Sequence, residues 1–444
     1  MRISESLDFS IAEDDMDVNR LEQYLAREIK EFGKRVFVKV LQEIEAKKLE
    51  QAKGEVGCRE EVPRYLFTRL GLIRFQRHKV KYKEKGKFGF FLDEILGLKP
   101  YQVATRWVRR RALELAIEYP YRQARSLLRH EIGDDISYRT IHRWAQEEGK
   151  KLREEEEARQ ETVFGRAEKL RNDGKQREIV VLEVDGTMLH SQEKGEDDFE
   201  AKLGIMYSGK ELESKKAKHR RYRLKEKVVY GGIEGADDFG ERLYIQGEQK
   251  LSLSLARNLL LISDGARWIS DIAGADYLKA TYQLDWWHYE KKLRAALPGE
   301  LKLQQELMNL LWAGKREEHR RLLKLKRLVD GPSDKLDDLL GYLEENWDGI
   351  YGSRNLKSKV GAKEVLVVGS GGIEKNIDLM LCRRFKGRGM SWSRAGAQNL
   401  LKLRLLRYDW KAYWRRRVNR NLLEEVMQDE EFRLVNGASL VGAK

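Results

Sequence analysis

The segment Ile179-Val-Val-Leu-Glu-Val-Asp185-Gly186 decides the fold of this chain. Its aliphatic residues form a run long enough for a strand buried on both faces, and the glycine ends that run. A second run, Asn258-Leu-Leu-Leu-Ile-Ser-Asp264-Gly265, has the same form. Strands of this kind belong to sheets covered by helices. The sequence therefore predicts an α/β sheet with an aspartate at the end of each of these two strands.

A third acid follows a third apolar run in Val365-Leu-Val-Val-Gly-Ser-Gly-Gly-Ile-Glu374-Lys-Asn376. We expect a short strand here and then a helix that carries Glu374. Open α/β sheets bind ligands at the carboxyl ends of their strands. Carboxylate oxygens suit Mg²⁺, and two such ions roughly 3.5–4 Å apart can assist an in-line displacement at phosphorus. Together, Asp185, Asp264 and Glu374 predict a site for two Mg²⁺ ions, with Mn²⁺ as a substitute.

Each of these acids also has a simpler interpretation. An Asp-Gly pair is most often a turn after a strand, so neither Asp185 nor Asp264 indicates a site by itself. The ordered set that includes Glu374 is what favours the metal site. Glu183 shares a strand face with Asp185 and is either a supporting acid or a solvent-facing charge. Residues 344–345, two glutamates in a helical segment, are the alternative for the third ligand.

The composition favours a polyanionic partner. The 444 residues include 87 Lys+Arg and 73 Asp+Glu, which gives a formal net charge of +14. Basic surfaces bind nucleic acid by displacing its counterions, although a basic protein without such a partner can have the same composition. The two cysteines, Cys58 and Cys382, lie far apart in the sequence. This count and spacing argue against a zinc ribbon or a disulfide framework.

The sequence gives no sign of a membrane span or an export signal. No apolar stretch approaches the roughly 18–20 residues that span a bilayer. The first residues, Met1-Arg-Ile-Ser-Glu-Ser-Leu-Asp8, place acids where a signal peptide has a cationic start and an apolar block. We therefore expect no membrane partner and a cytoplasmic protein, associated with the nucleoid if its partner is DNA.

The first 160 residues predict helices around a basic hairpin. Residues 17–53 carry a helical stripe of apolar side chains, usable for packing or self-association. Residues 64–82 combine β-branched, aromatic and basic side chains, which is typical of a hairpin with a cationic face. A helix that ends near Gly133 and a second that starts after Ser137 then form a helix-turn-helix pattern.

In a helix-turn-helix motif the second helix offers its first residues to the major groove of DNA. Here these residues are Tyr138, Arg139 and Arg143, which we expect to contact double-stranded DNA. A helical hairpin of any other kind can produce a similar pattern, so the sequence leaves both interpretations open.

From about residue 176 the periodicity changes to that of strands. We expect strands at 178–185, 201–207, 226–233, 241–246, 258–263 and 281–285, with a helix near 250–257. Residues 286–360 return to a charged, helical pattern, and a strand pattern reappears at Val365–Val368. The simplest account is a helical insertion between the second and third acids of one α/β sheet.

In these features the chain resembles the DDE transposases of bacterial insertion sequences. It looks most like the ISLre type, which is related to the Mutator-like superfamily. The resemblance covers nearly the whole chain, and the ordered set of motifs carries it. The matching segments are Thr68-Arg-Leu-Gly71-Leu-Ile, Leu92-Asp93-Glu-Ile-Leu-Gly97, Glu183-Val-Asp185-Gly186, Ile262-Ser-Asp264-Gly265-Ala266, Leu284-Asp285-Trp-Trp-His288, Gly369-Ser-Gly-Gly-Ile-Glu374-Lys-Asn376 and Arg383-Arg384-Phe-Lys386-Gly-Arg388-Gly-Met390-Ser-Trp392-Ser.

The resemblance implies a ribonuclease H-like catalytic core, a mixed sheet flanked by helices, with Asp185, Asp264 and Glu374 as metal ligands. Such enzymes hydrolyse a phosphodiester to free a 3′-OH at the element end, and that hydroxyl then attacks target DNA. The pair Asp285-x-x-His288 matches a motif of Mutator-like relatives that supports the active site or the scissile DNA, so we count both residues as catalytic. Packing of His288 as a core histidine beside two tryptophans is the alternative.

Further side chains near the third acid extend this expected site. We expect Glu183 and Asn376 to contact the metal ligands and hold them in position without binding the ions themselves. The basic residues Arg383, Arg384, Lys386 and Arg388 follow Glu374 and are placed to hold DNA phosphates. Trp392 can stack on a distorted base near the cut, or it can serve packing alone.

On this basis the chain divides into six parts. They are an N-terminal helical segment (1–60), a hairpin plus helix-turn-helix DNA-binding region (61–160), the first part of the ribonuclease H-like core (176–288), an all-helical insertion (289–362), the last core strand with the helix of Glu374 (363–400) and a basic C-terminal tail (401–444). The fold class is thus α/β with an α-rich N-terminal region.

The expected function is that of a transposase acting on double-stranded DNA, both the element ends and the target. Two ends must be joined, so we expect a homodimer or a higher oligomer. Two other functions fit the sequence. One is a non-catalytic DNA-binding protein derived from such an enzyme, and the other is a ribonuclease H-like structure-specific nuclease that cuts without joining.

Overall fold

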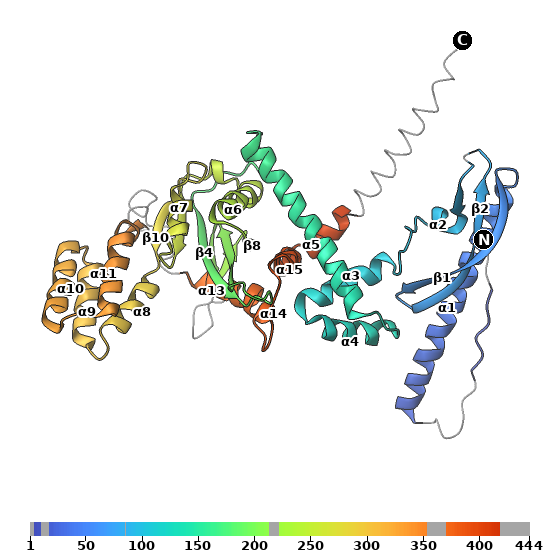
Figure 1. The fold of residues 1–444 in the computed structure, drawn as a ribbon, viewed down its shortest axis with the longest axis horizontal. Helices are drawn as coiled ribbons and strands as arrows, with labels where there is room; N and C mark the ends of the chain where they lie inside the picture. The colour runs from blue at the N-terminus through green and yellow to red at the C-terminus, as the bar shows by residue number, and fades with distance from the viewer. Residues whose placement is uncertain (1–3, 10–16, 85, 213–221, 353–369, 418–444) are drawn as a thin grey trace, which may run out of the picture. The chain divides into compact units, whose positions relative to one another are not determined.

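The computed structural model describes residues 4–9, 17–84, 86–212, 222–352 and 370–417. The chain forms two compact units, Met1–Gln146 and Glu147–Lys444 (Figure 1). The boundary between them lies within one helix, α5 (Tyr138–Gln160). Sequence periodicity placed the corresponding boundary near residue 160, because a continuous helical pattern gives no sign of a division inside it.

The first unit is built on a long helix and a hairpin. Helix α1 (Val18–Gln51) packs on an antiparallel sheet of β1 (Val56–Thr68), β2 (Gly71–Tyr82) and β3 (Phe88–Phe90). The predicted helix over 17–53 and the predicted hairpin are therefore confirmed. The apolar side chains at this contact form a small core of Leu41, Leu66, Ile73, Phe75 and Leu92.

Three further helices complete the part that contains the helix-turn-helix pattern. They are α3 (Arg106–Glu118), α4 (Tyr121–Ile132) and the start of α5. A single-turn helix, α2 (Phe91–Ile95), precedes them. Helix α4 ends at Gly133, whose φ of +80° favours glycine. Ser137 Oγ accepts a hydrogen bond from the backbone N–H of Arg139 at 3.2 Å, which caps the start of α5. The predicted helix, short turn and second helix are thus confirmed as structural elements.

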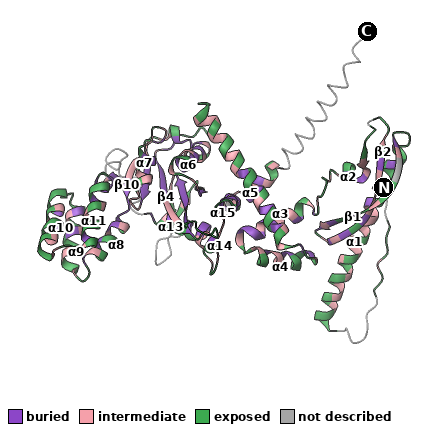
Figure 2. Cartoon of the chain, viewed as in Figure 1, coloured by how far each residue is buried: buried purple, intermediate pink, exposed green. Residues whose placement is uncertain are grey.

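The second unit contains a five-stranded mixed sheet in the order β10-β9-β4-β5-β8. The strands are β4 (Val180–Leu189), β5 (Phe199–Tyr207), β8 (Val228–Gly232), β9 (Leu259–Ser263) and β10 (Thr281–Leu284), and β6 (Gly209–Leu212) and β7 (Tyr222–Lys225) form a separate ribbon. Strand β4 is parallel to β9, which is parallel to β10, whereas β5 is antiparallel to both of its neighbours. The sheet is largely buried (Figure 2).

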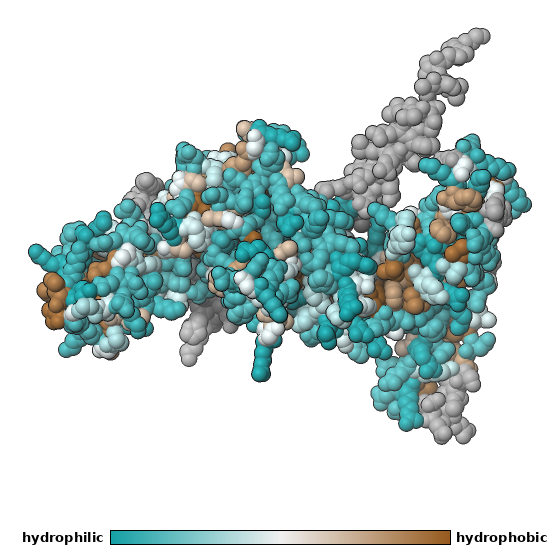
Figure 3. Space-filling view, in the orientation of Figure 1, coloured by the Kyte–Doolittle hydropathy of each residue, from teal (hydrophilic) through white to brown (hydrophobic). Residues whose placement is uncertain are grey.

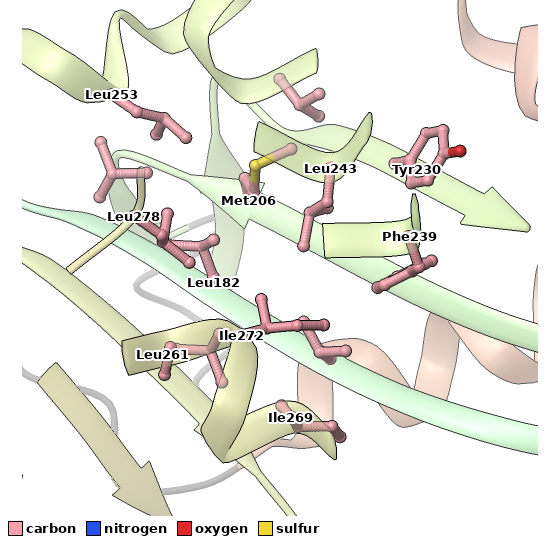
Figure 4. Packing of buried hydrophobic residues seen from close by; sticks show 14 of the residues in the cluster. Leu182, Met206, Tyr230, Phe239, Leu243, Leu253, Leu261, Ile269, Ile272 and Leu278 are labelled. Carbon is pink, nitrogen blue, oxygen red and sulfur yellow. The ribbon is translucent and has the colours of Figure 1, made fainter. Parts of the chain in front are cut away.

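Helices cover both faces of this sheet. On one face, α6 (Ala236–Leu251) and α7 (Arg267–Gly274) enclose a core that includes Leu182, Met206, Leu243 and Ile269 (Figure 4). On β4 the alternating positions Val180, Leu182 and Val184 belong to this core. The residues between them therefore point to the opposite face, which includes Glu183 and Asp185.

One predicted strand is wrong. Residues 241–246 lie in the middle of α6, and the expected helix at 250–257 is its last turn followed by a 3₁₀ turn, Leu253–Leu255. Phe239, Leu243 and Gly247 are spaced by four residues and are buried toward the sheet. A Cβ at Gly247 would lie 2.6 Å from Met206 Sδ on β5, so the helix approaches the strand closely.

The predicted helical insertion is confirmed over the described residues to 352. It contains α8 (Trp286–Ala296), α9 (Leu301–Trp312), α10 (Arg316–Asp330) and α11 (Asp334–Asn346), which share a core of their own. The predicted strand at Val365–Val368 lies outside the described residues. The chain resumes with α13 (Gly371–Ile377), α14 (Arg383–Phe385) and α15 (Arg394–Leu405). The molecular surface seen in Figure 3 is mostly hydrophilic, in keeping with a charged fraction of 36%.

Candidate active site at the ends of parallel strands

Strand register places the first two acids side by side. Glu183 of β4 pairs with Ile262 of the parallel strand β9. Two residues further along each strand, Asp185 and Asp264 reach the same level. Beside them Asp285 follows β10, and its backbone N–H donates to Ser263 O at 2.8 Å. Three neighbouring parallel strands thus each bring one aspartate to the same end of the sheet.

The two Asp-Gly pairs also make the local contacts expected of turns. Asp185 Oδ1 accepts a hydrogen bond from the N–H of Gly186 at 2.7 Å, and Asp264 Oδ1 accepts one from Ala266 at 3.1 Å. The carbonyl of Asp264 accepts a bond from Tyr342 Oη at 2.6 Å. Gly265 follows with a φ of +99° and no room for a Cβ beside that tyrosine ring. Asp185 and Asp264 therefore form turns and also lie in the candidate site.

Helix α13 brings Glu374 to the same region. Its carboxylate oxygen Oε1 lies 3.7 Å from His288 Nε2, on the first turn of α8, and 47% of the side chain is exposed. His288 Nε2 also lies 3.9 Å from Asp285 Oδ2. With 25% of its side chain exposed, His288 is not a core histidine. It faces Glu374 and Asp285.

The electrostatics of Asp185 show how close these groups are. Burial of its carboxyl group, together with the charges of Asp264 and Glu374, raises the pKa of Asp185 to about 6. The hydrogen bond from Gly186 and the charge of His288 act in the opposite direction. A cation among these carboxylates would relieve their repulsion, and their oxygen donors suit Mg²⁺. Among the residues that the structure describes, however, no three His, Cys, Asp or Glu side chains are arranged to hold one metal ion.

Two expected supporting residues have defined contacts. Glu183 is fully buried and faces the start of α13. Asn376 is also buried, with its Nδ2 donating to Gly372 O at 2.7 Å and its Oδ1 accepting from Lys227 Nζ at 3.1 Å. Glu183 is therefore not a solvent-facing charge, which was its alternative interpretation. The alternative third ligand, Glu344, instead pairs with Arg320 at 3.0 Å within the insertion.

Of the four basic residues predicted to hold DNA phosphates, three are exposed. Lys386 Nζ donates to Thr187 Oγ1 at 2.5 Å, two positions beyond Asp185 on β4. Arg383 pairs with Asp378 at 2.8 Å, and Arg388 also lies on the surface. Lys386 thus contacts the strand that carries Asp185 directly.

Arg384 and Trp392 differ from the expected phosphate and base contacts. Arg384 is 1% exposed, and its guanidinium lies 5.3 Å from the centre of the Trp392 ring. Trp392 Nε1 donates to Phe385 O at 2.9 Å, and the two rings pack 5.1 Å apart. Both side chains stabilise the chain around α14, because an arginine can bury its stem and stack on an aromatic face. The structure thus buries Arg384 instead of presenting it at the surface, and Trp392 makes packing contacts.

In the first unit, the predicted DNA-contacting residues lie at the start of α5. Arg139 and Arg143 are exposed, and Tyr138 is half-buried with the guanidinium of Arg122 5.1 Å from its ring centre. Arg122 on α4 was not predicted, since only the fold brings it beside Tyr138.

In the second unit, Ser370 was also missed. It contacts Asp285, and a serine just before a helix is a common capping signal.

The fold and these acids define an α/β protein with an ionisable site at one end of its sheet. Residues 11–421 match the Uncharacterised protein family (UPF0236), and the chain belongs to that family. Three similar proteins, all UPF0236 proteins of Caldanaerobacter subterraneus subsp. tengcongensis, are 22%, 23% and 23% identical over 347 residues. The match covers 77% of this chain but 66%, 66% and 63% of the relatives, so the chain spans about two thirds of their length. Their names join eleven, four and two designations, respectively.

Proposed function

We propose that this chain is a DDE-type transposase that cleaves DNA at the ends of an insertion sequence and joins them to target DNA with divalent metal ions. One observation carries the proposal. Asp185 and Asp264 reach the same level of neighbouring parallel strands, and Glu374 approaches them closely enough for its charge to raise the pKa of Asp185. Acids from three distant parts of the sequence thus converge at one end of the sheet.

The architecture supports the ribonuclease H-like core that the sequence resemblance implies. Among the strands of the described sheet, β5 alone is antiparallel to the rest, and helices cover both faces. The helical insertion also separates the strands of Asp185 and Asp264 from the helix of Glu374. This is the order of parts expected of such an enzyme.

The relatives provide an independent argument. Eleven designations under one name in one organism indicate a protein encoded many times in a genome. Genes that copy themselves to new positions produce that multiplicity, whereas the gene of a housekeeping enzyme does not copy itself. Family membership transfers this argument to the present chain as a proposal.

DNA is the partner that the charge distribution favours. The net charge of +14, the exposed Arg139 and Arg143 on α5, and Lys386 beside the strand of Asp185 all suit a polyanion. No helix among the described residues is long and apolar enough to cross a membrane. We propose action on element ends and target DNA in the cytoplasm, at the nucleoid, by at least a dimer.

In this proposal Asp185, Asp264 and Glu374 hold two Mg²⁺ ions, with Mn²⁺ as a substitute. Bound ions of this kind supply an activated water or hydroxyl and stabilise the leaving oxygen of the phosphodiester. His288, 3.7 Å from Glu374, orients that carboxylate or contacts the scissile phosphate. Lys386 holds a neighbouring phosphate, since its ammonium lies beside Thr187 on the strand of Asp185.

A second candidate function is a non-catalytic DNA-binding protein of the same descent. The absence of a three-ligand metal arrangement among the described residues favours it. Against it stands the retention of all three acids at one end of the sheet. A nuclease that cuts without joining is the third possibility, and the same experiment separates the three.

The experiment uses the full chain, Mg²⁺ and DNA that carries the terminal inverted repeats flanking its gene. We expect joined products, and a loss of at least about a hundredfold in Asp185→Asn, Asp264→Asn and Glu374→Gln, because metal ligation contributes several kcal/mol to the transition state. Glu344→Gln on the insertion is the matched control and should remain active. Specific binding without cutting would support the second function, and nicks that are never joined would support the nuclease.

A further inference from the structure

The start of helix α13 lacks a local cap. Its N-cap residue, Ser370, makes no side-chain hydrogen bond to the first turn, and the helix opens with Gly371 and Gly372. Backbone N–H groups in the first turn of a helix need acceptors from elsewhere. Here Glu183 supplies one to the first turn, and Asp285 accepts from the N-cap residue, Ser370, itself. Both carboxylates are buried and distant in the sequence from α13.

Glu183 supplies the first acceptor. Its Oε2 accepts a hydrogen bond from the N–H of Ile373 at 2.7 Å, and its Oε1 accepts one from Tyr207 Oη at 2.6 Å. The residue is fully buried, and a buried carboxylate is costly unless such bonds compensate it. A Cβ at Gly372 would lie 2.7 Å from Glu183 Oε2, so the glycine lets the helix come this close without displacing that carboxylate.

Asp285 supplies the second acceptor and links two helices. Its Oδ1 accepts from the N–H of Trp287 at 2.9 Å and so caps α8. Its Oδ2 accepts from the N–H of Ser370 at 3.1 Å and also from Ser370 Oγ. Only 2% of Asp285 is exposed. One carboxylate therefore fixes the helix of His288 relative to the segment that leads into the helix of Glu374.

We propose that Glu183 and Asp285 are positioning residues, which together anchor the start of α13 and hold Glu374 beside Asp185 and His288. The inference rests on the proposed function and deepens it. Both carboxylates are occupied by backbone and hydroxyl donors, so they act through Glu374 and not as metal ligands. For Asp285 this replaces the catalytic role expected from the sequence with an anchoring one.

The test measures hydrogen–deuterium exchange of residues 370–377 in the full chain, alongside strand transfer. Glu183→Ala should speed that exchange about tenfold, because it removes a buried hydrogen bond to a charged acceptor. Glu183→Gln keeps an acceptor oxygen for Ile373 and should restore most of the protection and most of the strand transfer. Ser370→Ala, which removes one bond to Asp285, should give a smaller rise in exchange. Glu178→Gln, two residues before the start of β4, is the control and should change neither.

The measurements distinguish a failure of the anchoring from a failure of the proposed function. Unchanged exchange in both Glu183→Ala and Ser370→Ala would overturn the anchoring. So would normal exchange combined with strand transfer as low in Glu183→Gln as in Asp185→Asn, because Glu183 would then act through its charge. If Glu183→Ala fails to fold, Ser370→Ala and Glu183→Gln still decide. If the wild-type chain performs no chemistry on DNA, the proposed function fails, yet the exchange data still decide whether α13 is anchored.

Discussion

Asp185 and Asp264 lie at the same level of two neighbouring parallel strands, although 79 positions separate them in the sequence. Parallel pairing imposes this closeness, because two parallel strands in register bring their carboxyl ends to the same edge of the sheet. The energetic consequence is repulsion, because the charge of Asp264 opposes ionisation of the partly buried Asp185. An arrangement with this cost is typical of a functional site.

The first prediction concerns metal binding. Without metal, Asp185→Asn should raise the midpoint of thermal unfolding by about 2–4 °C, because it removes a buried charge and its repulsion. Addition of Mg²⁺ should stabilise the wild-type chain by mass action and leave Asp185→Asn unchanged. Differential scanning fluorimetry with and without EDTA measures both effects. Equal stabilisation of the two proteins by Mg²⁺ would exclude Asp185 as a ligand.

The second prediction is a loss of stability in acid that originates in the insertion. His319 is fully buried, its Nε2 lies 2.7 Å from Tyr289 Oη, and burial lowers the pKa of His319 to about 4. An unfolded histidine titrates near 6.5. Between pH 6.5 and 4 the unfolded state therefore binds a proton that the folded state does not, so stability falls as the pH falls through this window, by up to about 3 kcal/mol.

Trp347 provides a measurement of this effect, because its ring lies 6.0 Å from that of His319. Tryptophan fluorescence during urea unfolding at pH 7 and pH 4.5 should show the loss. His319→Phe should remove most of the pH dependence, whereas His130→Gln, an exposed histidine on α4, should retain it. A pH dependence that survives in His319→Phe would assign the effect to other groups.

The sequence predicted those elements whose signals are local. The strands of Asp185 and Asp264 are aliphatic runs ended by glycine, and the insertion has a clear helical period. Residues 241–246 were misassigned because Leu243 and Ile245 alternate as in a strand, while the four-residue spacing from Phe239 to Leu243 only shows its meaning once the sheet is present.

The site was predicted as a set of acids but not as a set of contacts. Glu183 was left open between a supporting acid and a surface charge, since its bond to Ile373 spans 190 positions and depends on how α13 packs. The burial of Arg384 was missed for the same reason, because an arginine in a basic run resembles its exposed neighbours until Trp392 is placed over it.

The third prediction separates a structural arginine from a DNA-contacting lysine. Arg384→Ala should lower the free energy of unfolding by about 1–3 kcal/mol through loss of its stacking and burial. Lys386→Ala should leave stability within about 0.5 kcal/mol but weaken DNA binding and reduce the slope of log K against log salt by about 1. Thermal unfolding and fluorescence anisotropy at several salt concentrations measure these effects. A stable Arg384→Ala variant with a reduced salt slope would reverse the assignment.

The fourth prediction tests the helix-turn-helix. Arg139 and Arg143 are exposed on the first turns of α5, whose start is fixed by Ser137. If they contact base edges, each alanine substitution should cost about 1–3 kcal/mol of binding to the terminal repeats and much less on unrelated DNA. Lys47→Ala, which removes one exposed cation from α1, is the control and should weaken both DNAs slightly and equally. Electrophoretic mobility shift assays with both DNAs measure the difference, and an equal loss on repeat and unrelated DNA would reduce these arginines to phosphate contacts.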